Sequence, residues 1–322
     1  MTSPARRWKY DNIRAFLMFC VVLGHFLESF DGWDALYQFI YTFHMPAFIF
    51  LSGYFAKFRP DTLLRRMVLP YLLFQTFYLV FDRYVLGGSG TLQYTTPYWL
   101  LWYLPALIGW NLLLPAIGTD RPGKMAAVLL GSAALGLAVG FVSGAGRFLT
   151  LSRLLVFFPY FAAGVYWREL KATVPFSRRV LIITAACAAA GLTLLTLGAG
   201  LSREMYYGAS GYDASGGDPV YRLLLYAAGA ACIAVIFLLA PDRPIPGLTA
   251  WGRHTMPIYL LHGFVVRLSQ RWGIFHDSKE QNFCLALVLS LAVMAVFGFS
   301  SEHNSNQCPS QAGPGEDQRQ RT

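Results

Sequence analysis

The sequence predicts an all-α, polytopic membrane protein with about ten transmembrane helices and both termini in the cytoplasm. Of its 322 residues, 55% are hydrophobic and only 13% are charged, whereas soluble domains are about a quarter charged. Apolar runs follow one another along almost the whole chain, and basic residues are concentrated in alternate connections between them. At this length a soluble protein could bury a large core and still keep a charged surface, so the depletion of charge indicates lipid contact.

The apolar runs have the roughly 17 to 25 residues that a helix needs to cross a hydrocarbon core about 30 Å thick. They lie near 13–30, 36–56, 67–86, 98–118, 125–144, 151–168, 179–200, 220–240, 254–269 and 283–300. The first run is followed directly by further spans, so we interpret it as an uncleaved first helix rather than a signal peptide.

The orientation follows from the distribution of Lys and Arg. With the N-terminus inside and ten crossings, 18 of the 26 basic residues fall on the cytoplasmic side and eight on the outer side. The outer eight are Arg83, Arg147, Arg153, Arg203, Arg222, Arg267, Arg271 and Lys279. Cytoplasmic loops carry an excess of Lys and Arg, so this bias supports an even number of spans and cytoplasmic termini.

The polar parts of the chain narrow the function classes. The net charge of +9 is scattered in short tracts, whereas a nucleic-acid binder would gather it on one polar domain, so we expect no nucleic-acid partner. The cysteines have no metal-ligand spacing, and no metal site is expected. The membrane domain is predicted to occupy 1–300, and the polar stretch 301–322 to be a disordered cytoplasmic tail. The Gly-, Ser- and Tyr-rich loop 201–219 is either a plain connector or a mobile, carbohydrate-facing lid.

Two histidines, His25 and His44, lie inside the first two spans. An ionisable group within the bilayer is costly and marks a functional site by default. Counting residues from the span ends places both about 18 Å from the cytoplasmic side, so we expect them level with each other on antiparallel helices. The alternative is a structural pair that is hydrogen-bonded to backbone or hydroxyl groups.

Arg14 and Glu28 share a helix face with His25. Arg14 precedes His25 by eleven residues, which is close to three whole turns and about 16 Å along the axis. It is therefore expected at the cytoplasmic mouth of a line that leads to His25. Glu28 lies one turn beyond His25. It could orient the imidazole or raise its basicity, or it could be a solvated interfacial acid.

A basic cluster follows the second span. It contains Lys57, Arg59, Arg65 and Arg66. Such a cluster suits the phosphates of an anionic cofactor, and it also suits ordinary anchoring of the topology. His262, in the ninth span, could serve the same cavity as His25. No role is expected for the histidines at the membrane edge or outside the spans, which are His254, His276 and His303.

Six segments, taken in order, carry a resemblance. They are Asp11–Asn12–Ile13–Arg14 with Gly24–His25, FHMPAFIFLSGYF (43–55), Arg65–Arg66 before Pro70–Tyr71, WLLWYLPALIGWN (99–111), FFPYFAAGVYW (157–167) and WGRHTMPIYLLH (251–262). Together they resemble the acyltransferase-3 family of integral membrane O-acyltransferases over roughly residues 8–300. More loosely, the chain is similar to the fucose 4-O-acetylase-like branch of that family.

The resemblance implies a ten-helix bundle in the cell (plasma or inner) membrane. Such an enzyme takes an acyl group, usually acetyl, from cytoplasmic acyl-CoA. The acceptor is a hydroxyl of a carbohydrate, a cell-surface glycan or a secreted metabolite, and no metal is involved.

The same resemblance assigns roles to residues. Arg14 and His25 match the family's arginine–histidine pair, with His25 as the general base or the acyl carrier. Arg65 and Arg66 match its paired-arginine signature imperfectly, because Leu63 occupies the first arginine position. The chemistry of the transfer, rather than the resemblance, suggests that His44 positions the acceptor or polarises the thioester carbonyl.

Two other classes compete with this interpretation. A proton-coupled transporter or flippase could use the intramembrane histidines as a relay, but it predicts paired repeats with interrupted helices, and the sequence has no such symmetry. A non-catalytic membrane scaffold gives no reason for the shared register of Arg14 and His25.

Overall fold

The computed structural model describes residues 8–88, 91–118, 122–169, 177–276 and 278–305, and all regular elements in these residues are helices. The all-α prediction is therefore confirmed. The physical reason is that lipid offers no hydrogen-bond partners, so an apolar chain must satisfy its backbone groups within each spanning segment.

Each predicted span coincides with a helical segment. These segments are α1 (Trp8–Leu27), α2 (Asp34–Phe55), the continuous run of α3 (Pro60–Leu63), η1 (Leu64–Val68), α4 (Leu69–Phe81) and η2 (Asp82–Leu86), η3 (Trp99–Trp102) with α5 (Tyr103–Ile117), α6 (Pro122–Ala138), α7 (Leu151–Glu169), α8 (Arg178–Gly198), α11 (Pro219–Leu239), α13 (Thr255–Arg271) and α14 (Lys279–Ser305). The short helices are η4 (Val139–Phe141), η5 (Ser143–Ala145), η6 (Phe148–Thr150), α9 (Arg203–Tyr207), α10 (Tyr212–Ser215) and α12 (Leu248–Arg253).

In the described part of the chain, seven helices are long and apolar enough to cross a membrane by length and composition. The segments α2, 60–86 and α13 are not among the seven. Helix α13 has only 17 residues, and segment 60–86 alternates between α- and π-helix. Helices α2 and α13 also carry buried polar side chains of the candidate site, which lowers their hydropathy. The chain is a polytopic helical membrane protein.

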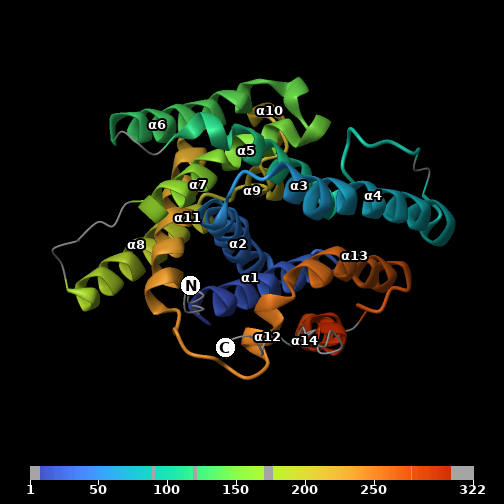
Figure 1. Ribbon diagram of the computed structural model, residues 1–322. Coiled ribbons are helices and arrows are strands. Elements are labelled where there is room, and N and C mark those ends of the chain that lie inside the picture. Colours follow the sequence, from blue (N-terminus) through green and yellow to red (C-terminus); the bar gives the residue numbers. More distant parts are fainter. Residues whose placement is uncertain (1–7, 89–90, 119–121, 170–176, 277, 306–322) are drawn as a thin grey trace, which may run out of the picture.

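Helix α2 lies in the middle of the bundle, between α1 and the α7–α11 pair (Figure 1). Helices α12, α13 and α14 pack against α1 on one side, and α6 covers α7 on the other. Helix α8 packs against α11 at the edge of the molecule, where few of its residues are buried. This arrangement encloses α2 and one face of α1, which are the two helices that carry His25 and His44.

Helices α2 and α7 touch backbone to backbone. A Cβ on Gly164 would lie 2.0 Å from the carbonyl oxygen of Phe50, and one on Gly53 would lie 2.0 Å from that of Phe161. Small residues allow this close approach, which replaces the hydrophobic driving force that is missing between helices in lipid.

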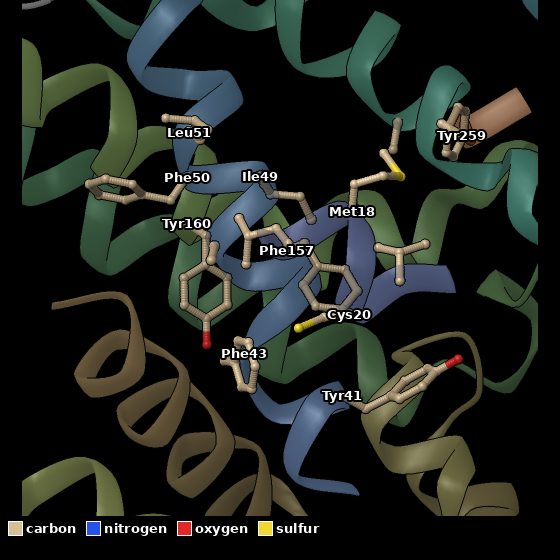
Figure 2. Close-up of a cluster of buried hydrophobic side chains, with 14 of the residues drawn as sticks. Met18, Cys20, Tyr41, Phe43, Ile49, Phe50, Leu51, Phe157, Tyr160 and Tyr259 are labelled. Atoms are coloured by element: carbon tan, nitrogen blue, oxygen red, sulfur yellow. The ribbon is translucent and has the colours of Figure 1, made fainter. Parts of the chain in front are cut away.

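Part of the buried core around α2 is formed by side chains of α1, α2, α7 and α13. Figure 2 shows Met18 and Cys20 of α1, Tyr41, Phe43, Ile49, Phe50 and Leu51 of α2, Phe157 and Tyr160 of α7, and Tyr259 of α13. Tyr41 and Phe43 leave α2 on opposite sides (Figure 2). One face of α2 therefore packs into the bundle, and Tyr41, on another face, lines the candidate site.

Helix α14 continues past residue 300 to Ser305, so it extends into the stretch 301–322 that was predicted to be a disordered tail. The remainder of that stretch, 306–322, lies outside the described residues.

Candidate functional site

Two cavities meet at His25. The first, which we call the Arg14 cavity, has a volume of about 490 Å³ and is lined by Arg14, Ser52, Arg66 and Tyr103 among others. The second, the Glu28 cavity, has a volume of about 440 Å³ and is lined by Glu28, Tyr41, His44 and Arg267 among others. Residues that line both are His25, Met45, Leu100 and Trp102. Arg14 is near the first turn of α1 and Glu28 follows its last, so the cavities lie at opposite ends of this helix.

His25 forms a pair with Glu28. Its Nδ1 lies 3.3 Å from Oε1 of Glu28, and both side chains are about 15% exposed or less. Two tyrosine hydroxyls donate to the same carboxylate oxygen, that of Tyr41 at 2.5 Å and that of Tyr37 at 3.4 Å. The carboxylate is thus held in place, and the predicted contact one turn beyond His25 is present.

The contact with Glu28 sets the tautomer of His25. A carboxylate can only accept, so Nδ1 of the imidazole carries the proton and donates it to Glu28. Nε2 then has a free lone pair, which can accept a proton from a reacting group. This is the orientation that a general base requires.

His262 stacks on His25, with ring centroids 5.4 Å apart and an interplanar angle of 24°. It is fully buried, and its Nδ1 donates to the carbonyl of Ile258 at 3.0 Å. Its Nε2 has no hydrogen-bond partner in the described residues. The sequence indicated that His262 could serve the same cavity as His25. His262 lines neither cavity, and the packing of α13 against α1 brings it against the His25 ring instead.

His44 also reaches this region but through a different contact. Its ring packs against Tyr41 with centroids 4.6 Å apart, and its Nδ1 donates to the carbonyl of Ile40 at 2.7 Å. The Tyr41 hydroxyl in turn lies 3.3 Å from Nδ1 of His25. The two histidines expected at one depth thus line the same cavity, with Tyr41 connecting them.

Arg14 lines the Arg14 cavity together with His25, as the helical register predicts. Its Nη1 pairs with Oδ1 of Asp11 at 3.2 Å, and its guanidinium lies 4.6 Å from the centroid of the Phe55 ring. These contacts hold the side chain in a fixed position at the cavity wall.

Only part of the predicted basic cluster faces this cavity. Lys57, Arg59 and Arg66 line it, whereas Arg65 does not. Neighbouring residues on a helix point about a quarter turn or more apart, and the turn of η1 that faces the cavity presents Arg66 and Met67 to it. The structure brings Arg66, and not Arg65, to the cavity.

The wall of the Glu28 cavity contains unusual backbone. Trp99 (φ 28°) and Thr150 (φ 55°) line it, and Leu149 (φ 44°) adjoins Thr150. Positive φ is uncommon for residues other than glycine, and such conformations cluster at ligand sites, where the surrounding structure holds them. These two wall residues carry no sequence signal, because neither is of a type that favours positive φ.

The loop between α8 and α11 forms part of the same wall through Tyr207 and Ala209. The Tyr207 and Tyr37 hydroxyls are 2.5 Å apart, and Arg203 pairs with Asp34 at 2.6 Å. Burial raises the pKa of Tyr207 to about 12, so its hydroxyl stays protonated at neutral pH. The loop that could be a connector or a lid is therefore tied to α2 and faces the cavity.

In the described ranges, no group of three or more His, Cys, Asp or Glu side chains is placed to hold a metal ion.

Comparison of the chain with protein families finds the acyltransferase domain of the acyltransferase 3 family, which matches residues 7–301. Comparison with curated proteins and with solved structures finds no match. The family match spans α1 to α14 and includes every residue of both cavities, so the chain belongs to the acyltransferase 3 family and is a membrane acyltransferase.

Proposed function

We propose that the protein transfers an acyl group, acetyl in the first instance, from cytoplasmic acyl-CoA to a hydroxyl of a carbohydrate, a cell-surface glycan or a secreted metabolite. The observation that carries the proposal is the position of His25, paired with Glu28, where the two cavities meet. A donor in one cavity and an acceptor in the other would both reach this imidazole.

The Arg14 cavity suits the donor. Lys57, Arg59 and Arg66 give it three positive charges beside that of Arg14, and arginine binds phosphate by paired hydrogen bonds. The pantetheine arm would then run from these phosphates past Arg14 to His25. Since both termini are predicted in the cytoplasm, this end of α1 would open to the cytoplasmic pool of acyl-CoA.

The Glu28 cavity would take the acceptor from the outer side. Nε2 of His25 removes the hydroxyl proton as the oxygen attacks the thioester carbonyl carbon. The new C–O bond forms, the C–S bond breaks, and the CoA thiolate leaves and takes the proton from the imidazolium. Glu28 stabilises that imidazolium through Nδ1. In this proposal His44 positions the acceptor, and His262 holds the His25 ring against which it packs.

An assay with labelled acetyl-CoA tests this proposal. The label is in the acetyl group, the protein is purified, and a membrane extract supplies the acceptor. We expect release of CoA and transfer of label into an ester that mild base cleaves. If the folded protein neither released CoA nor formed a labelled ester, the proposed reaction would be wrong.

Two neighbouring arginines allow a matched test of the proposed acyl-CoA site. Arg66→Ala is expected to raise the KM for acetyl-CoA by roughly 10- to 100-fold, because a hydrogen bond to a charged group contributes about 1.5–3 kcal/mol. Arg65→Ala, on the neighbouring residue that does not line the cavity, should leave KM within about twofold. An equal effect of the two substitutions would place the CoA phosphates elsewhere.

A further inference from the structure

Three arginines line the Glu28 cavity, and they outnumber its acids. They are Arg147, Arg153 and Arg267, and Glu28 is the single carboxylate among the lining residues. That carboxylate already faces His25 and accepts from two tyrosine hydroxyls. Within the described residues, none of the three arginines has a carboxylate at ion-pair distance. The cavity therefore has an unmatched positive charge.

Two of these arginines lie over tryptophan rings. The Arg267 guanidinium lies 4.5 Å from the ring centroid of Trp99, and that of Arg153 lies 4.8 Å from the ring centroid of Trp102. A cation over an indole face is attracted to the ring, and this contact does not use the N–H donors of the guanidinium. The indoles thus serve as platforms that orient the two arginines, rather than as open faces for a neutral sugar ring.

Two buried donors in this wall lack a partner. Nε of Arg267 and Oγ1 of Thr150 have none in the described residues, and Thr150 is only 2% exposed. Arg153 uses its Nε for the carbonyl of Tyr207 at 3.1 Å, and Arg267 uses Nη1 for Oε1 of Gln270 at 3.0 Å. An unsatisfied buried donor costs about 1–3 kcal/mol, so the polar groups of this wall are incompletely paired within the described residues.

Ordinary topology signals do not explain these arginines. Basic residues favour cytoplasmic segments, and only eight of the 26 in this chain fall on the outer side of the predicted topology. Three of those eight gather around one cavity. Glu204 is close enough for its charge to act on Arg153, but it accepts from Ser210 at 2.7 Å and does not line the cavity.

From this wall we infer that the acyl acceptor is an anion: a hydroxyl compound whose carboxylate or phosphate binds Arg153 and Arg267, with Arg147 adding positive charge at the rim. The inference rests on the proposed function, because it takes the Glu28 cavity as the acceptor site. Binding of the anion would place a hydroxyl of the same molecule beside His25, whereas a neutral acceptor would leave the arginines without counter-charge.

The test uses two pairs of probes that differ only in a charged group. They are methyl glucoside with methyl glucuronoside, and glucose with glucose 1-phosphate. Consumption of labelled acetyl-CoA by the purified full-length protein is followed as each probe is added. The anionic member is expected to change the rate, as acceptor or as competitor, at a concentration roughly 10- to 100-fold below that of its neutral partner. The pair that responds tells carboxylate from phosphate.

Substitutions of the cavity arginines test whether they cause the preference for the anionic probe. Arg267→Gln and Arg153→Gln should reduce the ratio between paired probes towards one, and Arg267→Lys should keep most of it because the charge remains. Arg271→Gln, one turn further along α13 on an exposed residue that does not line the cavity, should leave the ratio unchanged. Size-exclusion profiles and thermal unfolding confirm that each variant is folded.

The failures of the two ideas are distinguishable. Three results, obtained while acetyl-CoA turnover persists, would overturn the inference that the acceptor is an anion. The two members of a pair could act equally, neither could have an effect, or the preference for the anion could survive both glutamine substitutions. Loss of turnover in the wild-type protein itself would overturn the proposed function, and the inference would fall with it.

Discussion

His25→Ala is expected to lower the rate of acyl transfer by roughly 10²- to 10⁴-fold, which is the usual contribution of a positioned general base. The imidazole lies at the junction of both cavities, and its Nδ1 is fixed by Glu28. Of the other two histidines in this region of the described chain, His262 lines neither cavity and His44 lines only the Glu28 cavity, so neither lies at the junction. Labelled acetyl-CoA turnover gives the measurement.

His276→Ala is the matched control, because this histidine is exposed and lies outside both cavities. It should retain the wild-type rate. Glu28→Gln keeps the shape of the carboxylate but removes its charge, so we expect an intermediate loss that appears in kcat rather than in the KM for acetyl-CoA. A folded His25→Ala protein with the full transfer rate would remove His25 from the reaction.

Gly164→Val is expected to prevent folding or to destabilise the protein by at least the roughly 1–3 kcal/mol that overpacking costs. Any Cβ at this position would meet the Phe50 carbonyl at 2.0 Å, and backbone cannot swing aside as a side chain can. Helices α2 and α7 would have to separate, which would also displace Met45 and His44 from the cavities. Thermal unfolding in detergent and the yield of monodisperse protein measure the effect.

The control for this change is Gly191→Ala in α8, where a Cβ meets no atom within 4 Å. This residue is exposed at the edge of the bundle, so the substitution should be neutral or stabilise the helix by up to about 1 kcal/mol. If Gly164→Val unfolded at the same temperature as the wild-type protein, the close contact of α2 with α7 would not support the fold.

Much of the fold could be predicted from the sequence because lipid imposes one solution. Runs of apolar residues must be helices, and all ten predicted spans coincide with helical segments. The shared face of Arg14 and His25 could be predicted for the same reason, since helical geometry alone fixes it. The contact of Glu28 with His25 is likewise a matter of local spacing.

The contacts between side chains of different helices could not be predicted, because they depend on how the helices pack. The stacking of His262 on His25 requires α13 to pack against α1, and a single sequence contains no signal for that pairing. The separation of Arg66 from Arg65 depends on the rotation of η1. Arg153 and Arg267 come from helices far apart in the chain, so their meeting in one cavity is visible only in three dimensions.

Release of CoA from acetyl-CoA supplied to one side of a sealed membrane tests the two-cavity account most directly. Acetyl-CoA does not cross the bilayer, so vesicles of opposite orientation present it to one end of α1 or to the other. The account predicts release by inside-out vesicles, which expose the predicted cytoplasmic side with Arg14, and no release by right-side-out vesicles. Inside-out vesicles of His25→Ala should release CoA roughly 10²- to 10⁴-fold more slowly. Equal release by right-side-out vesicles would contradict it.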